Sequence, residues 1–193
     1  MDMKPIGAAR LGLGCWPLAG PFYRGDIPLG YGPADDPAAL ATIHAAWDAG
    51  LRLFDTAAVY GAGRAERLLA EALADRPDAI IVSKIGLAFD EDSLQMTGPD
   101  IDPAHVAPAI EGCLRRLKRD HVDLMLLHPN EMTIAQAEPI FEEMARAHDA
   151  GKIGVFGWST DVPDALRAVA GRPGFAGVAY RLNVFAPGPQ REA

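Results

Sequence analysis

The sequence has few cysteines, few basic residues and no long apolar run. Cys15 and Cys113 are its only cysteines, they lie far apart, and neither belongs to a Cys-x-x-Cys or Cys/His pattern. We therefore expect neither a disulfide framework nor a zinc site, and two isolated thiols are typical of a reducing cytoplasm. No stretch of about eighteen apolar residues exists, and residues 1–10 lack the apolar core of a signal peptide. These absences predict a cytoplasmic protein without a membrane partner.

Basic residues are also too few and too scattered for a nucleic-acid surface. The chain has 18 Lys and Arg against 26 Asp and Glu, which gives a net charge of -8, and no run of Lys or Arg occurs. A nucleic acid or an anionic lipid is therefore not an expected partner. Asp90, Glu91 and Asp92 form an acidic cluster without a spaced set of further ligands. This pattern favours a solvated loop over a metal site.

What the sequence has in plenty is alternating apolar patterns. With 193 residues, 49% of them hydrophobic, the chain can bury its own core, and we expect a single domain over residues 1–193. Strand-like runs at residues 11–15, 51–54, 79–83, 122–127, 153–157 and 177–184 alternate with helical patterns at 37–50, 64–75, 103–119, 136–150 and 162–170. This alternation predicts an α/β fold with a parallel sheet. A closed eight-stranded β/α barrel takes about 250 residues, so we expect an incomplete TIM-type barrel of about six β/α units.

One loop, residues 16–37, is rich in Gly and Pro and is longer than a compact domain normally contains. We interpret it as an active-site loop, because long ordered loops usually serve a function. It carries Phe22, Tyr23 and Tyr31. These aromatic side chains either line a substrate pocket or pin the loop to the rim of the barrel, and the sequence leaves both possibilities open.

Four polar residues lie at or just beyond the ends of predicted strands. Asp55 and Tyr60 follow the strand at 51–54, Lys84 follows the strand at 79–83, and His128 follows the strand at 122–127. The carboxyl ends of parallel strands meet at one end of a β/α fold, where such folds keep their chemistry. The sequence therefore predicts a site that combines a carboxylate, a phenol, an ammonium and an imidazole.

These four groups suit the reduction of a carbonyl group. When hydride reaches the carbon, the oxygen needs a proton, and Tyr60 is a candidate donor. A tyrosine is a weak acid, with an ordinary pKa of about 10, unless a neighbouring cation such as Lys84 stabilises the phenolate. Asp55 would keep a buried Lys84 charged, and His128 would hydrogen-bond the carbonyl oxygen.

The segments that carry these residues resemble the aldo-keto reductase family. The run FDTAAVYGAGRAE at residues 54–66 is similar to a signature of that family. In the same order as in the family follow SKIG at 83–86, LRRL at 114–117, HVDL at 121–124, LH at 127–128 and GKIGVFGWS at 151–159, while LGLGCW at 11–16 resembles its first barrel strand. The combination is far more specific than any single segment.

The resemblance implies an oxidoreductase that reduces an aldehyde or ketone, or oxidises the alcohol, with NADP(H) as cofactor. It implies that Asp55, Tyr60, Lys84 and His128 are the catalytic tetrad. It also implies a set of cofactor contacts: Gly14, Trp16, Ser159, Thr160 and Asn183. Thr160 stands where the family usually has asparagine. The loops with which the family grips the cofactor phosphates, after its seventh and eighth strands, have no counterpart in this sequence, so we expect an incomplete cofactor anchor.

Two other functions remain compatible with the sequence. One is a truncated barrel without dinucleotide binding that acts as a binding or interaction protein. The other is a non-redox acid/base enzyme that uses the same tetrad. In each case six strands would leave unpaired sheet edges, so we expect a homodimer or higher oligomer that covers the open edge of the barrel.

Overall fold

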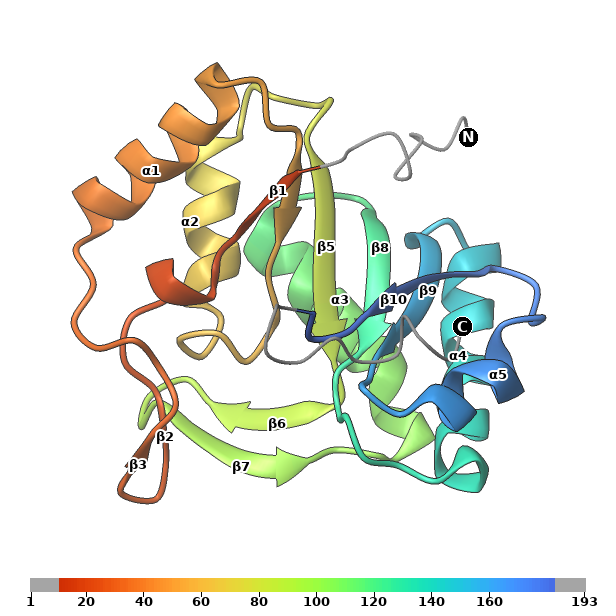
Figure 1. Cartoon of the computed structure of the whole chain (residues 1–193). Helices are drawn as coiled ribbons and strands as arrows, with labels where there is room; N and C mark the ends of the chain where they lie inside the picture. The colour runs from red at the N-terminus through yellow and green to blue at the C-terminus, as the bar shows by residue number, and fades with distance from the viewer. Residues whose placement is uncertain (1–10, 183–193) are drawn as a thin grey trace.

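Six parallel strands form the main sheet of the structure, a computed structural model in which residues 11–182 are described (Figure 1). They are β1 (Gly12–Gly14), β4 (Leu53–Asp55), β5 (Ile80–Ile85), β8 (Val122–Leu127), β9 (Ile153–Ser159) and β10 (Phe175–Ala179). Their order in the sheet, β1-β4-β5-β8-β9-β10, follows their order along the chain. This is the topology of an incomplete TIM-type β/α barrel, and it confirms the predicted fold class.

One helix follows each of the first five strands, and Figure 1 shows these helices outside the sheet. They are α1 (Asp36–Asp48), α2 (Arg64–Ala72), α3 (Val106–Leu117), α4 (Ile134–Asp149) and α5 (Pro163–Val169); two short 3-10 helices are η2 (Trp16–Leu18) and η3 (Pro103–His105). Local sequence sets several helix starts. The Asp35 carboxylate accepts a hydrogen bond from the Ala38 N–H before α1, and Thr133 and Gln136 form a capping box before α4.

The core lies on both faces of the main sheet. On the outer face, Phe141 of α4 packs against Phe156 and Trp158 of β9. Because side chains alternate along a strand, the intervening positions point to the inner face of the barrel. They form a second, smaller apolar cluster of Val82, Leu124, Leu126 and Val155. Both faces of the central strands are therefore buried, as parallel sheets require.

A second sheet was not predicted from the sequence. It has the order β3-β2-β7-β6 and consists of β2 (Tyr23–Arg24), β3 (Ile27–Pro28), β6 (Leu87–Asp90) and β7 (Gln95–Pro99). It joins the loop at residues 16–37 to the segment after β5. The Gln95 side chain accepts a hydrogen bond from the Gly25 N–H and donates one to the Gly25 carbonyl. The loop predicted to serve the active site is thus tied to a hairpin that follows the strand carrying Lys84.

The last strand lies earlier than predicted, at Phe175–Ala179 instead of residues 177–184. Its register is set by a close approach of two glycines, because a Cβ atom at Gly157 would lie 1.8 Å from the Gly177 carbonyl oxygen. This approach depends on a residue of the neighbouring strand, which a local pattern does not reveal. Residues 183 and beyond, including the predicted contact Asn183, lie outside the described residues.

Two further findings concern the described part of the chain. No helix among residues 11–182 is long and apolar enough to cross a bilayer. Within the same residues, His, Cys, Asp and Glu side chains do not gather in threes as a metal site would need. Asp90, Glu91 and Asp92 lie at the exposed β6–β7 turn, where Glu91 forms ion pairs with Arg67 and Arg116.

Candidate active site

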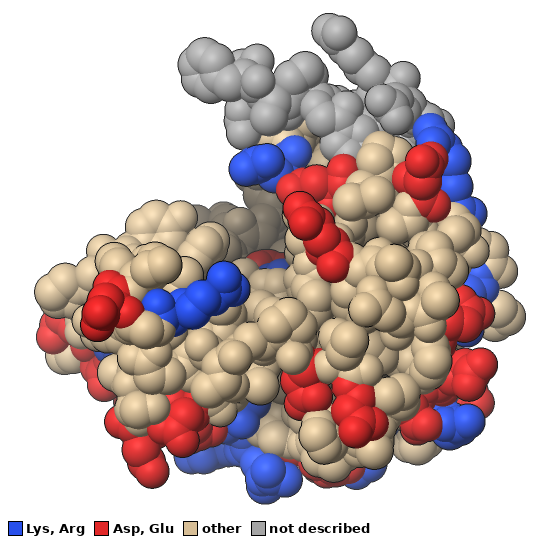
Figure 2. Space-filling view, turned by 90° about the horizontal axis from the view of Figure 1, so that it is seen from below, with Lys and Arg blue, Asp and Glu red and all other residues tan. Residues whose placement is uncertain are grey.

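Asp55, Tyr60, Lys84 and His128 come together at the carboxyl ends of the parallel strands. Asp55 is the last residue of β4, Lys84 is the last but one of β5, His128 directly follows β8, and Tyr60 lies in the turn between β4 and α2. Figure 2 shows the molecule from below the viewpoint of Figure 1, with a hollow in its surface between two protruding parts. Most atoms around this hollow belong to residues that are neither acidic nor basic. We refer to the four residues as the mouth cluster.

The ammonium group of Lys84 lies at the centre of the mouth cluster. Its Nζ atom donates hydrogen bonds to Asp55 Oδ1 at 2.6 Å and to the Thr56 carbonyl at 2.8 Å. A longer contact of 3.4 Å joins it to the phenol oxygen of Tyr60. Lys84 is only 4% exposed, so these three oxygens replace the water that its three donors would otherwise bind. The sequence did not reveal the carbonyl of Thr56 as a partner.

The turn that carries Tyr60 is fixed by the backbone around it. Gly61 has a φ of 58°, and a Cβ atom there would lie 2.1 Å from the Ala19 carbonyl oxygen, so only glycine fits. The ring of Tyr60 stacks on Trp16, with 5.5 Å between the ring centroids and an interplanar angle of 8°. Its side chain is therefore held between Trp16 of η2 and Lys84 of β5.

The pKa of Tyr60 differs in direction from the prediction. Burial, and then the negative charge of Asp55, raise the pKa of the Tyr60 phenol above its usual value. We expected Lys84 to lower it. However, the Lys84 charge is already compensated by Asp55 at 2.6 Å, and its distance to the phenol oxygen is longer than that of a strong hydrogen bond. The phenol consequently keeps its proton at neutral pH.

His128 is held beside Tyr60 as a neutral imidazole. Its backbone N–H donates to the Ile85 carbonyl at 2.8 Å, and its ring meets that of Tyr60 edge to face at 5.7 Å. Burial, and then the charge of Lys84, lower the pKa of His128 to about 3. The Nδ1 atom is buried and has no hydrogen-bond partner among the described residues. An unpaired buried nitrogen costs free energy unless a ligand or water satisfies it.

Cys15 also lies near the mouth cluster. The thiol is buried, and its pKa is raised to about 12 by burial and by the charge of Asp55. Its backbone N–H donates to the Asp55 carbonyl at 2.8 Å. Cys15 therefore remains a neutral, unreactive thiol that helps to fix the end of β4.

The predicted cofactor contacts fall into two groups. Gly14 ends β1 with open space around its Cβ position, and Ser159 ends β9 as a half-buried residue. The Thr160 hydroxyl, in contrast, is used within the protein: it donates to the Asn130 carbonyl at 2.9 Å and accepts from the Val162 N–H at 3.1 Å. Thr160 thus joins the loops after β8 and β9. The role of Asn130 in this link had no signal in the sequence.

The aromatic residues of the loop at 16–37 differ in burial and in what they contact. Phe22 is buried and pins the loop, and Tyr23 lies in β2. Tyr31 is 67% exposed and meets the ring of Trp16 edge to face at 5.3 Å. The indole N–H of Trp16 donates to the Leu29 carbonyl at 3.1 Å, which fixes its orientation. Of the two predicted roles, pinning the loop holds for Phe22, whereas Tyr31 is exposed and contacts only the ring of Trp16 among the aromatic side chains described.

A second buried ion pair lies on the opposite face of β5. The Ser83 hydroxyl donates to Glu66 Oε1 at 2.7 Å, and Arg116 Nε donates to Glu66 Oε2 at 2.6 Å. Glu66 is fully buried, and its charge is compensated by Arg116. We refer to these three residues as the outer cluster. Because Ser83 and Lys84 are consecutive, their side chains point to opposite faces of the strand.

Several known proteins are similar to this chain in sequence. A model of the aldo/keto reductase family matches residues 10–192. Among curated proteins, the chain is 32% identical over 171 residues to aldo-keto reductase YhdN of Bacillus subtilis, a match that covers 86% of this chain and 48% of YhdN. It is 27% identical to the uncharacterized oxidoreductase YqkF of the same organism, of which 57% is covered. The chain thus spans about half the length of these relatives.

Solved structures also match most of this chain and about half of their own length. The glycerol dehydrogenase AKR11B4 from Gluconobacter oxydans matches with a TM-score of 0.77 and 31% identity, over 94% of this chain and 54% of that protein. An aldo-keto reductase from Klebsiella pneumoniae in complex with NADPH matches with a TM-score of 0.60 and 26% identity, over 86% of this chain and 52% of that protein. In both cases the similarity extends over most of the described β/α units.

Proposed function

The chain belongs to the aldo/keto reductase family, and on this basis we propose that it transfers hydride between NADP(H) and a small carbonyl compound or alcohol. The proposal depends most on one observation. A buried ammonium, Lys84, contacts both a carboxylate, Asp55, and a phenol, Tyr60. This is the arrangement that carbonyl reduction with Tyr60 as proton donor requires. We propose a cytoplasmic setting, which suits the two free, buried thiols.

The residues at the strand ends fit a nicotinamide ring. Gly14 leaves space beside β1, and the buried His128 Nδ1 atom lacks a partner among residues 11–182. We assign Ser159 to the carboxamide group and Gly14 and Trp16 to the walls of the cofactor site. Thr160 supports Ser159 through its link between two loops, and Asn183 remains a proposed contact. When bound, the reduced nicotinamide supplies the hydride for the substrate carbon.

Tyr60 provides the proton for the substrate oxygen. Its raised pKa keeps the phenol protonated at neutral pH until negative charge develops on that oxygen. When the phenol O–H bond breaks, the phenolate is left 3.4 Å from the Lys84 ammonium, whose positive charge stabilises it. Asp55, at 2.6 Å from Lys84 Nζ, compensates the charge of the buried ammonium and holds it in place. Asp55 thus affects Tyr60 indirectly, because it holds the Lys84 ammonium beside the phenol.

His128 orients the substrate. Because its pKa is lowered to about 3, the imidazole is neutral at physiological pH and carries one N–H and one lone pair. A neutral imidazole beside Tyr60 can donate a hydrogen bond to the same carbonyl oxygen without competing as an acid. We propose that Trp16 and Tyr31 line the approach to this point, because their rings meet at the rim of the site.

Two measurements on the 193-residue chain test the proposed function. NADPH is titrated by its fluorescence, and NADPH oxidation is then followed by absorbance with a panel of aldehydes and ketones. We expect micromolar binding and carbonyl-dependent oxidation. Failure to bind NADPH would contradict the proposal and favour an interaction protein. Conversion of a substrate without NADPH would favour non-redox acid/base chemistry at the same tetrad.

We also propose that the chain forms a homodimer or higher oligomer. β1 and β10 are the edges of the main sheet within the described residues, and exposed apolar side chains lie in or beside each of them. Leu11 flanks β1, while Val178, Tyr180 and Leu182 lie in or after β10. Unpaired edges with apolar side chains favour pairing with another chain. Light scattering at increasing concentration should give a mass above that of one chain; a monomer at every concentration would contradict this proposal.

A further inference from the structure

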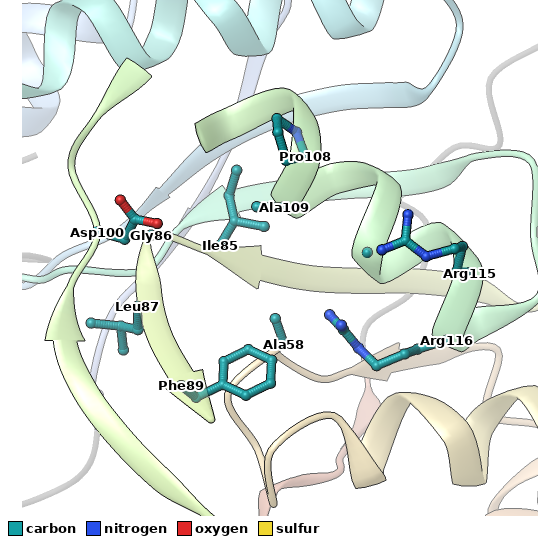
Figure 3. Close-up of a pocket in the computed structure, with 11 residues that line it drawn as sticks. Ala58, Ile85, Gly86, Leu87, Phe89, Asp100, Pro108, Ala109, Arg115 and Arg116 are labelled. Carbon is teal, nitrogen blue, oxygen red and sulfur yellow. The ribbon is translucent and has the colours of Figure 1, made fainter. Parts of the chain in front are cut away.

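A cavity of about 160 Å³ lies between β6 and α3 (Figure 3). Most of its lining is apolar: Ile85, Leu87, Phe89, Pro108 and Ala109. An apolar cavity of about 150 Å³ in another protein takes up a benzene molecule. The cavity between β6 and α3 is therefore large enough for one aromatic ring or a short alkyl chain.

One end of the cavity carries two guanidinium groups. Arg115 and Arg116 extend from α3, and Figure 3 shows them at the same side of the cavity. A Cβ atom placed on Gly112 would lie 3.3 Å from Arg116 Nη1 and 3.8 Å from Arg115 Nη2. Both cationic groups thus converge over a residue without a side chain. Arg116 is already paired with Glu66 and Glu91, so the Arg115 guanidinium is the group that would attract an anion to this end of the cavity.

The donors of these two arginines are only partly used. Nε of Arg116 is bound to Glu66, but its Nη atoms have only long contacts, 3.4 Å to Glu91 Oε1 and 3.7 Å to Cys113 Sγ. Arg115 has no acidic partner within the described residues. A guanidinium group binds carboxylates through two parallel N–H groups, so unused Nη donors suit a carboxylate ligand.

The other end of the cavity disfavours an anion. Asp100 lines it, and its carboxylate already bonds to His105 Nδ1 at 2.8 Å. A ligand with one negative end and one apolar end would therefore bind in a single orientation, with the negative end at Arg115. Cation–π contact between Arg116 and Phe89, at 5.4 Å, holds the arginine against the apolar wall.

We propose that this cavity is a binding site for a small organic carboxylate with an apolar body. The site is separate from the mouth cluster. The two sites adjoin along β5: Ile85, which lines the cavity, follows Lys84 in the strand, and its carbonyl accepts a hydrogen bond from the His128 N–H at 2.8 Å. The proposal rests on the cavity and its two arginines, and it holds whether or not the chain is a reductase.

Benzoate is the probe for the first test, with benzyl alcohol and acetate as matched controls. Benzyl alcohol keeps the ring and lacks the charge, whereas acetate keeps the charge and lacks the ring. In a titration followed by amide chemical shifts in the whole chain, we expect benzoate to bind with a Kd of about 1 mM. The shifts should centre on residues 85–89 and 108–116. Shifts confined to Asp55, Tyr60, Lys84 and His128, or equal affinity for all three compounds, would overturn the proposal.

Two variants test the roles of charge and space. Arg115→Ala, at an exposed position on α3, should weaken benzoate binding about tenfold. Gly112→Val should abolish it by filling the cavity between the arginines. Lys118→Gln, which removes a charge at the end of the same helix, is the control and should bind benzoate as the parent does. Unchanged binding by Arg115→Ala would refute the site.

Discussion

Two buried ion pairs lie next to each other along β5, one on each face. In the mouth cluster, Lys84 contacts Asp55 at 2.6 Å and faces the inside of the barrel. In the outer cluster, Arg116 contacts Glu66 at the same distance, and the hydroxyl of Ser83 completes the group. Both pairs are short and involve consecutive residues of one strand, Lys84 and Ser83. The Asp55 side chain is 35% exposed at the mouth, whereas the Glu66 carboxylate is fully buried.

The two clusters differ in whether their groups can transfer a proton. The mouth cluster contains a phenol that can give a proton and a neutral imidazole that can hydrogen-bond a substrate oxygen. The outer cluster contains a guanidinium group, which does not lose its proton in proteins, and a carboxylate closed off between α2, β5 and α3. The first arrangement therefore suits chemistry and the second suits stability. The following variants test that division.

The largest effect is expected for Lys84→Met. Removal of the ammonium leaves the Asp55 charge near Tyr60, which disfavours the phenolate further. We expect kcat for carbonyl reduction to fall about 10²- to 10⁴-fold. Steady-state rates of NADPH oxidation measure this change, and circular dichroism checks that the fold is kept. A kcat within about twofold of the parent value would contradict the role of Lys84.

Arg116→Leu should lower the stability of the fold and leave the activity unchanged. It leaves Glu66 buried without its cation, which costs about 3–5 kcal/mol of the free energy of unfolding. Urea unfolding measures that loss, while kcat per folded molecule should stay close to that of the parent. The double variant Glu66→Leu/Arg116→Leu is the control. It should recover much of the stability, because no unpaired charge remains.

A smaller effect is expected on the free energy of unfolding at acid pH, and it depends on His128. In the unfolded chain this imidazole binds a proton below its ordinary pKa of about 6.5. In the folded protein the pKa of His128 is lowered to about 3. At pH values between about 3 and about 6.5 the unfolded state therefore binds more protons than the folded state. The contribution of His128 to stability is therefore complete above about pH 6.5 and is lost as pH falls towards 3.

Urea unfolding at pH 7 and pH 5 tests this dependence on His128. Between these values the parent should lose about 2 kcal/mol more than His128→Gln, which has no group that titrates in this range. Parallel losses in the two proteins would show that the imidazole is already protonated or exposed in the folded state.

The smallest effect is expected for Ser83→Ala, the residue beside Lys84 on the other face of β5. It removes one hydrogen bond to a carboxylate whose other oxygen still binds Arg116. We expect a loss of about 1–2 kcal/mol in unfolding free energy and no change in kcat. A large drop in kcat would mean that the outer cluster also controls the position of Lys84.

The sequence predicted the main sheet and the mouth cluster because both depend on local patterns. Apolar runs mark all six parallel strands, and Asp55, Lys84 and His128 lie at strand ends, where parallel topology brings residues together. The second sheet was missed because β2 and β3 have only two residues each, and the partner of β2 is β7, far away in the sequence.

Other details depend on contacts that no local pattern encodes. The direction of the Tyr60 pKa shift follows from burial beneath Trp16 and from the pairing of Lys84 with Asp55. The use of the Thr160 hydroxyl follows from its contact with Asn130 across two loops. The register of β10 follows from the approach of two glycines. Each of these details depends on a contact between residues that are distant in the sequence.

The central claim is that Tyr60 donates the proton in carbonyl reduction, and Tyr60→Phe tests it most directly. The variant removes one oxygen and keeps the ring that stacks on Trp16. Single-turnover oxidation of NADPH by an aldehyde, measured beside the parent and Ser83→Ala, gives the rate of the chemical step. The account predicts a fall of about 10²- to 10⁴-fold with NADPH affinity and unfolding free energy nearly unchanged. A rate equal to that of the parent would contradict it.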